Sequence, residues 1–164
     1  MTIDVRTSPR RTLRFASPRE ILSDLESVVA WHREGRLHAS GNWDAGTILM
    51  HLALPIERSM DGFKVNTIPL VKRILGRTLL RPIVLRLPEF KPGIKLDRKT
   101  EAAIFRQTDF DEGYSHLHAQ LRRWIGGTPM THPHPMFGPM NTEQWDFFHR
   151  RHSALHLSFL QPRA

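Results

Sequence analysis

The sequence predicts an all-α protein, a four-helix bundle with one long crossover connector between its second and third helices. Three observations support this prediction. Four segments repeat apolar residues at three- and four-residue spacing, which is the period of an amphipathic helix. Alternating strand patterns are almost absent, and 83–87 is the only strand candidate. The 164 residues, of which 40% are hydrophobic, suffice for one domain with its own core.

The first helix is expected to begin after Ser17 and to fade near Gly35. Ser17 is a good N-cap, Pro18 suits the first helical position, and Glu20 stands where a capping box closes. An apolar stripe at helical spacing follows, formed by Ile21, Leu22, Leu25, Val28 and Val29. Residues 1–12 are interpreted as a disordered basic tail, so the single bundle domain is expected to span 13–161.

The second helix is expected to follow Asn42, which can cap it, and to end near Gly62. One apolar line runs along it at i, i+4 and i+8, formed by Ile48, Leu52 and Ile56. Pro55 lies inside this helix and predicts a kink, because proline cannot donate to the carbonyl of His51.

The third helix is expected over about 108–125, and the fourth from Asn141 to a point before Pro162. Gln144 stands in the reciprocal capping position of the fourth helix. Each helix carries an apolar face at helical spacing. These faces are Phe110, Tyr114, Leu117, Leu121 and Trp124 in the third helix, and Trp145, Phe148, His152, Leu155 and Phe159 in the fourth.

The connector, 63–107, is rich in proline and cations and is expected to hold a short helix around 70–80. The chain has a net charge of +8, and the connector contributes Lys72, Arg73, Arg77, Arg81 and Arg86. These cations could meet a membrane surface, bind phosphate-rich nucleic acid, or form a solvated or inter-subunit face. No nucleic-acid reader motif and no cluster of stacking aromatics is present, so no specific nucleic-acid partner is expected.

No apolar stretch reaches the roughly 20 residues of a membrane span, and no apolar segment follows the basic N-terminus as in a secretory signal. We therefore expect a cytoplasmic protein without a membrane span. The apolar residues of the connector permit a homodimer.

The ten histidines are the residues of greatest chemical interest, because the chain has no cysteine and any metal must be bound through nitrogen or oxygen. His152 and His156 are i and i+4 on one helix, close enough to chelate one ion. His51 is i+3 from Ile48 and therefore points at or beside the core. Three imidazoles from two helices would form an open site for a divalent metal, zinc or nickel.

The alternative interpretation is that these residues are structural, since a single histidine on an apolar face is usually a hydrogen-bonded core residue. His149 shares the stripe of the fourth helix, but its spacing of seven from His156 makes joint ligation awkward. Trp43 could wall the metal pocket or anchor the helix start. His134 could act from a lid as a proton shuttle, or could cap a backbone group in a rigid proline loop. These three residues are the candidates for the pocket or for support of the ligands.

Three stretches of the sequence resemble the DinB-like (YfiT-like) metalloenzyme superfamily. They are 41–53, where a tryptophan precedes a His-Leu pair by about eight residues, 149–159, which resembles the final histidine motif, and 134–145. The last stretch narrows the resemblance to an uncharacterised, domain-of-unknown-function branch. That branch usually shows two adjacent histidines near the end, and here Leu155 replaces the first.

The resemblance implies a divalent metal at His51, His152 and His156 and a metal-dependent enzyme acting on a small molecule. Characterised relatives implied by it include thiol S-transferases, isomerases and hydrolases, and dimers are common among them. The sequence singles out no general base or nucleophile. The competing hypothesis is a non-catalytic binding or interaction bundle with a structural or vestigial histidine cluster.

Overall fold

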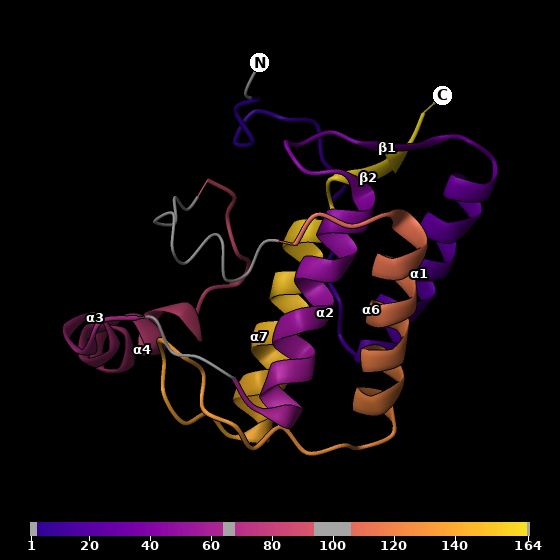
Figure 1. Ribbon diagram of the computed structural model, residues 1–164. Coiled ribbons are helices and arrows are strands. Elements are labelled where there is room, and N and C mark those ends of the chain that lie inside the picture. The colour runs from indigo at the N-terminus through magenta and orange to yellow at the C-terminus, as the bar shows by residue number, and fades with distance from the viewer. Residues whose placement is uncertain (1–2, 64–67, 94–105, 164) are drawn as a thin grey trace.

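The structure, a computed structural model, describes residues 3–63, 68–93 and 106–163, and its chain is mostly helical (Figure 1). The expected parts of the connector at 64–67 and 94–105 lie outside the described residues. Four long helices pack together: α1 (Pro18–Arg33), α2 (Ala45–Asp61), α6 (Phe110–Ile125) and α7 (Thr142–Leu157). Helix α2 contacts both α6 and α7, and α1 contacts the same two helices. The prediction of a mostly helical fold is confirmed.

A two-stranded antiparallel sheet lies at one end of the bundle (Figure 1), and the sequence did not predict it. Strand β1 (Leu37–Ala39) pairs with β2 (Leu160–Pro162), so that Leu37 faces Pro162 and Ala39 faces Leu160. Three residues per strand are too few for an alternating pattern to show. The pairing follows from the position of the chain after α7, which brings the C-terminal residues beside the link from α1 to α2.

The helix starts depend on side-chain caps. Ser17 accepts a hydrogen bond from the Glu20 backbone N–H, and Asn141 forms the full capping box with Gln144 at the start of α7. The prediction that Asn42 caps α2 is wrong. Asp44 is the cap, because its Oδ1 accepts from Thr47 N at 2.7 Å, while the Asn42 side chain bonds the backbone of residue 3.

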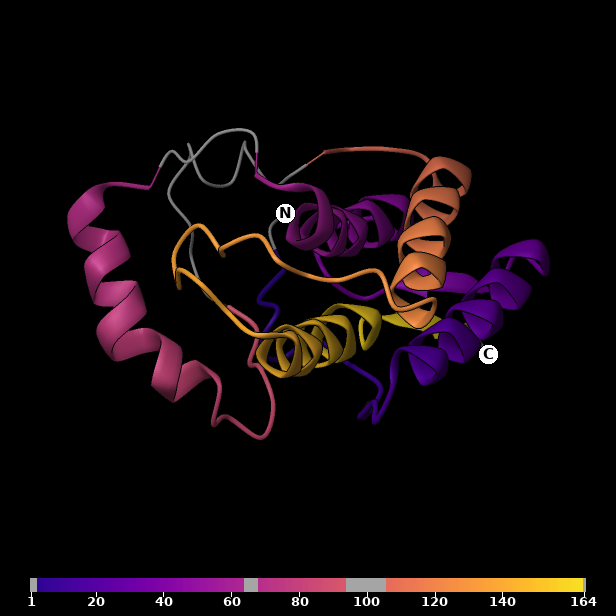
Figure 2. The same cartoon turned by 90° about the horizontal axis from the view of Figure 1, so that it is seen from below.

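The connector forms one continuous helical segment made of α3 (Leu70–Leu75), a π turn η1 (Gly76–Leu80) and α4 (Arg81–Val84). Figure 2 shows this segment to one side of the four long helices. The strand candidate at 83–87 is wrong. Its first residues complete α4, and the Leu85 N–H bonds the carbonyl of Arg81 at 2.9 Å, as in a helical turn.

Residues 3–12, for which a disordered tail was expected, contact the bundle. Arg11 pairs with Asp24 of α1 through two bonds of 2.6 and 2.9 Å, and its N–H bonds the carbonyl of Ser158 at 2.9 Å. Arg11 also lies over the Trp31 ring, 4.9 Å from its centroid. Among the described residues, none of the helices is long and apolar enough to cross a membrane.

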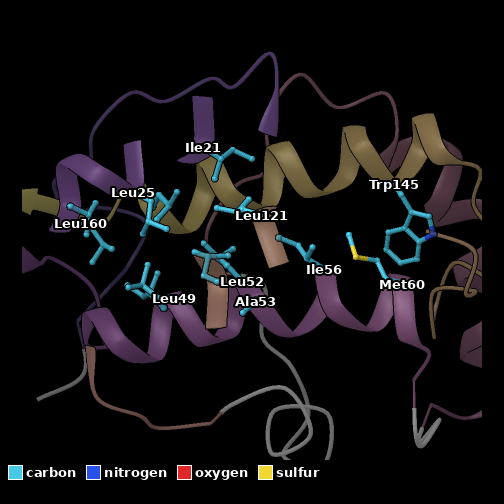
Figure 3. Packing of buried hydrophobic residues seen from close by; sticks show 14 of the residues in the cluster. Ile21, Leu25, Leu49, Leu52, Ala53, Ile56, Met60, Leu121, Trp145 and Leu160 are labelled. Atoms are coloured by element: carbon cyan, nitrogen blue, oxygen red, sulfur yellow. The ribbon is translucent and has the colours of Figure 1, made fainter. Parts of the chain in front are cut away.

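The core lies between the long helices, and Figure 3 shows its side chains filling the space between α2 and α7. Trp145 is fully buried near one end of this core and Leu160 near the other. Helices α2 and α6 cross very closely, because a Cβ on Gly46 would lie 2.3 Å from the Asp109 carbonyl oxygen. Helix α2 is thereby held against α6 on one side and α7 on the other, which fixes the position of His51.

Candidate metal centre

The structure brings His51, His152 and His156 together between α2 and α7. One ligand nitrogen from each of the three side chains can be chosen so that all three lie within 4.8 Å of one another. The Nε2 atoms of His51 and His152 are 3.1 Å apart. His152 and His156 project from successive turns of α7, and His51 faces them from the middle of α2. This three-histidine group can hold a metal ion.

The rings of the three histidines stand edge-on to one another around a common point. Their centroids are 4.6–4.9 Å apart, with interplanar angles of 64°, 69° and 85°. Two nitrogens bound to one zinc at about 2.0–2.1 Å in a tetrahedron lie about 3.3 Å apart. The 3.1 Å separation of the His51 and His152 nitrogens is close to that value. The three nitrogens as a set lie within 4.8 Å, so the rings would have to move closer together for all of them to bind one ion.

Burial keeps His152 and His156 of α7 neutral. It is the main cause that lowers the pKa of both His152 and His156 well below the ordinary histidine value, and the neighbouring imidazoles lower it further. Protonating one ring here would place a charge in a poorly solvated position next to the others. The neutral imidazole is the form that binds metal, so the site is ready to bind without first losing protons.

Two aromatic side chains flank the three histidines. Trp43, just before α2, stacks on the His156 ring at 5.5 Å and 4°, and meets the His51 ring edge-on at 4.8 Å. Phe148, one turn before His152 on α7, lies 5.6 Å from the His152 ring. The structure therefore places Trp43 against the cluster, as expected of a pocket wall. Phe148 was not singled out from the sequence as a site residue, although its i−4 spacing from His152 is a usable signal.

His149 lies apart from the three-histidine group, one turn earlier on α7. It is 1% exposed, and its Nε2 is 3.2 Å from the Ser59 hydroxyl oxygen. Because the Ser59 hydroxyl donates to the Ile56 carbonyl, the Nε2–H of His149 must be the donor to Ser59. The ring stacks on Trp145 at 5.0 Å and 12°. Burial lowers the pKa of His149 to about 3.

His134 lies in the loop before α7 and organises that loop. Its Nδ1 accepts two backbone N–H bonds of 3.1 Å, from Met136 and Phe137, and its own backbone pairs with Gly138. Its ring is packed among aromatic rings, including Phe137 at 4.4 Å, and burial lowers its pKa to about 3. This geometry matches the second of the two interpretations, a histidine that caps backbone groups in a rigid loop.

Three carboxylates of α2 and α7 are paired with other groups. Asp61 binds Arg123 through two bonds of 2.6 and 2.7 Å, and the hydrogen bond from Arg123 lowers the pKa of Asp61. Glu57 lies 3.2 Å from His116 on α6. Asp146 bonds Arg150 at 2.7 Å. The described metal group therefore consists of imidazoles alone, and a bound ion would keep its full positive charge.

A model of a protein family matches residues 7–163, and the family is described as "Protein of unknown function (DUF1569)". No curated protein and no solved structure matches. The expected membership of the DinB-like superfamily is wrong, because the matching family is a distinct one. Histidines at ligand spacing, which carry much of that resemblance, can serve any metal site between two helices and do not single out one family.

Proposed function

The chain belongs to the DUF1569 family, and we propose that it binds one zinc or nickel ion through His51, His152 and His156 and acts on a small molecule there. One observation supports this most: three imidazoles from two helices offer ligand nitrogens within 4.8 Å of one another. Imidazole suits both ions, and the chain has no cysteine that would favour a thiolate site.

Such an ion, held by three uncharged ligands, would supply Lewis acidity and would lower the pKa of a bound water. The protein contributes the surroundings. The Trp43 ring packed against His51 and His156 limits their reorientation and excludes water from that side. Phe148 covers His152 in the same way. Together these rings place apolar surface beside the three histidines, which favours a small substrate with one polar group directed at the ion.

The proposed reaction class is hydrolysis or group transfer assisted by the metal. Thiol S-transfer, which the sequence resemblance implied, stays a prediction. In the part of the chain that the structure describes, the imidazole cluster carries no acidic ligand that would neutralise the ion. An electrophilic role for the ion is therefore favoured over a purely structural one, because structural zinc sites usually have four protein ligands.

A second candidate function is a binding bundle in which the histidines are structural. The 3.1 Å contact between the Nε2 atoms of His51 and His152 favours it, since one ring can donate to the other without any metal. In that case the cluster would stabilise the α2–α7 contact as a partly buried hydrogen bond. The two candidates differ in metal content and can be separated directly.

Elemental analysis of protein purified without a histidine tag is the test. The parent chain is expected to hold about one zinc or nickel per chain, either as purified or after reconstitution and removal of excess metal. His152→Ala is expected to lose this metal while keeping its helical circular dichroism. His118→Ala on α6, which is outside the three-histidine group, is the matched control and should keep it.

Equal metal content in His152→Ala and the parent would overturn the assignment of the ligands. A parent chain that takes up no metal, even when reconstituted, would favour the structural cluster. If metal is bound as expected, activity screens with ester, amide and thiol-transfer substrates should show turnover that a chelator abolishes.

A further inference from the structure

The helical segment formed by α3, η1 and α4 exposes an apolar face that no other part of the described chain covers. Six large aliphatic side chains on it are 47–77% exposed: Leu70, Val71, Ile74, Leu75, Leu79 and Ile83. Contiguous apolar surface of this kind is unusual on a monomer and marks an interaction site. Figure 2 shows the segment standing beside the bundle, where one long side of it is open to a partner.

The π turn at Gly76–Leu80 keeps this face continuous. Within it the N–H of Arg81 bonds the carbonyl of Gly76, so the bond spans five residues instead of the four of an α-helix. Gly76 is buried and Arg81 donates from Nη1 to a carbonyl of the loop before α7 at 2.7 Å, so this side faces the protein. Ile74 and Leu79, also five apart and both exposed, share the outward side.

The same segment is strongly basic. Residues 68–88 contain no aspartate or glutamate and contain five cations: Lys72, Arg73, Arg77, Arg81 and Arg86. Among the described residues, none of these four arginines forms an ion pair. An apolar face bordered by arginines without acidic partners is complementary to a surface that is both apolar and negatively charged.

Three of these arginines line a hollow beside the apolar face. It has a volume of about 550 Å³ and lies between the segment and the start of α7. Its lining residues are Arg77, Thr78, Arg81, Pro82, Leu85, Arg86 and Gln144. A phosphate group could enter this hollow while the apolar face next to it is covered, because arginine forms bidentate bonds with phosphate oxygens.

We propose that residues 70–87 form a docking surface for a bilayer that contains anionic phospholipid. The apolar face enters the boundary between headgroups and acyl chains, and the arginines bind headgroup phosphates. A second copy of this chain is the less favoured occupant. Two such faces in contact would bring together five cations from each copy with no acid between 68 and 88 to compensate them.

Vesicle co-sedimentation of the full chain tests the proposal. The parent is expected to bind phosphatidylcholine vesicles that contain phosphatidylglycerol, and to bind pure phosphatidylcholine vesicles much more weakly. Adding salt should release it, because the arginine contribution is screened. The double variant R73Q/R86Q should bind roughly 30-fold more weakly, since each cation near such a surface contributes about fivefold. I74S/L79S should lose binding by more than about tenfold.

The control variants R19Q/R122Q and Ile3→Ser change exposed residues of the same types elsewhere on the chain and should bind like the parent. Light scattering of each protein gives its oligomeric state, and circular dichroism checks its fold. Three results would overturn the proposal: no binding of the parent to anionic vesicles, equal binding to both kinds of vesicle, or a dimer that I74S/L79S converts to a monomer.

Discussion

Acidification should unfold this protein in part through His149, and the size of that contribution can be worked out from its burial. His149 is 1% exposed, and burial lowers its pKa from 6.5 to about 3. In the unfolded chain the His149 imidazole regains its ordinary pKa of 6.5. Below pH 6.5 the unfolded state therefore takes up a proton that the folded state excludes. The stabilising contribution is complete above about pH 6.5 and is lost as the pH falls towards 3.

The magnitude follows from the shift. For each pH unit below the unfolded-state pKa, the free energy of unfolding falls by about 1.4 kcal/mol for one proton that only the unfolded state binds. At about pH 4.5, two units below it, the loss from His149 is about 2.7 kcal/mol relative to about pH 7.5. A folded-state pKa of about 3 or lower gives nearly this full value, because the folded protein then binds almost no proton at about pH 4.5.

Urea unfolding at several pH values, with chelator present, measures this contribution. His149→Gln keeps a side-chain N–H donor towards Ser59 but cannot take up the proton. Its free energy of unfolding should fall by about 2.7 kcal/mol less than that of the parent between about pH 7.5 and about pH 4.5. The control His32→Gln changes an exposed histidine of α1 and should follow the parent. Parallel curves for His149→Gln and the parent would refute the account of a neutral, buried His149.

Two further predictions concern stability. Gly46→Ala should lower the free energy of unfolding by about 2–3 kcal/mol in chemical denaturation, because its Cβ would lie 2.3 Å from the carbonyl oxygen of Asp109 at the start of α6. The control Ala119→Ser, on the exposed face of α6, should change this free energy little. Asp24→Asn should cost about 1–2 kcal/mol, since it breaks a two-bond pair whose Arg11 and Asp24 side chains are only 19% and 13% exposed. Glu34→Gln, in an exposed ion pair, should change stability by less than about 0.5 kcal/mol. Equal losses in the two members of either comparison would contradict the packing or the ion-pair argument.

The helices could be predicted from the sequence where the apolar pattern extended over several turns. The stripe of α6 and the capping box of α7 gave their positions to within a few residues. Asn42 and Asp44 are both good caps, however, and only a tertiary contact distinguishes them. The Asn42 side chain is hydrogen-bonded to the backbone of residue 3 and so does not cap the helix. The two-stranded sheet likewise depends on where the chain returns after α7 and has no local signal.

The π turn could not be predicted either. It forms where Gly76 lies so close to the loop before α7 that a Cβ would be 2.6 Å from Met136. That contact is set by the packing of the loop and not by the local sequence. Ordinary helical spacing therefore predicted the start of this segment, near residue 70, but not its extension to Val84.

At the site, the i, i+4 spacing was enough to place His152 and His156 side by side on α7. The third histidine, His51, joins them because it faces α7 across the α2–α7 interface. The apolar line of α2 indicated that direction. The bond from His149 to Ser59 had no signal in the sequence, because it joins two helices 90 residues apart. The two backbone bonds that His134 accepts are local to its own loop, and they match the capping role that the sequence offered as one of its two interpretations.

X-ray absorption of the zinc-loaded protein tests the central claim most directly, since it counts the ligands around the ion. The account predicts three imidazole nitrogens at about 2.0–2.1 Å, with the remaining coordination from water oxygen. His152→Ala should reduce the imidazole count or abolish binding, and His118→Ala should leave the spectrum unchanged. A parent spectrum with fewer than two imidazoles, or one that His152→Ala leaves unaltered, would contradict a metal centre built from His51, His152 and His156.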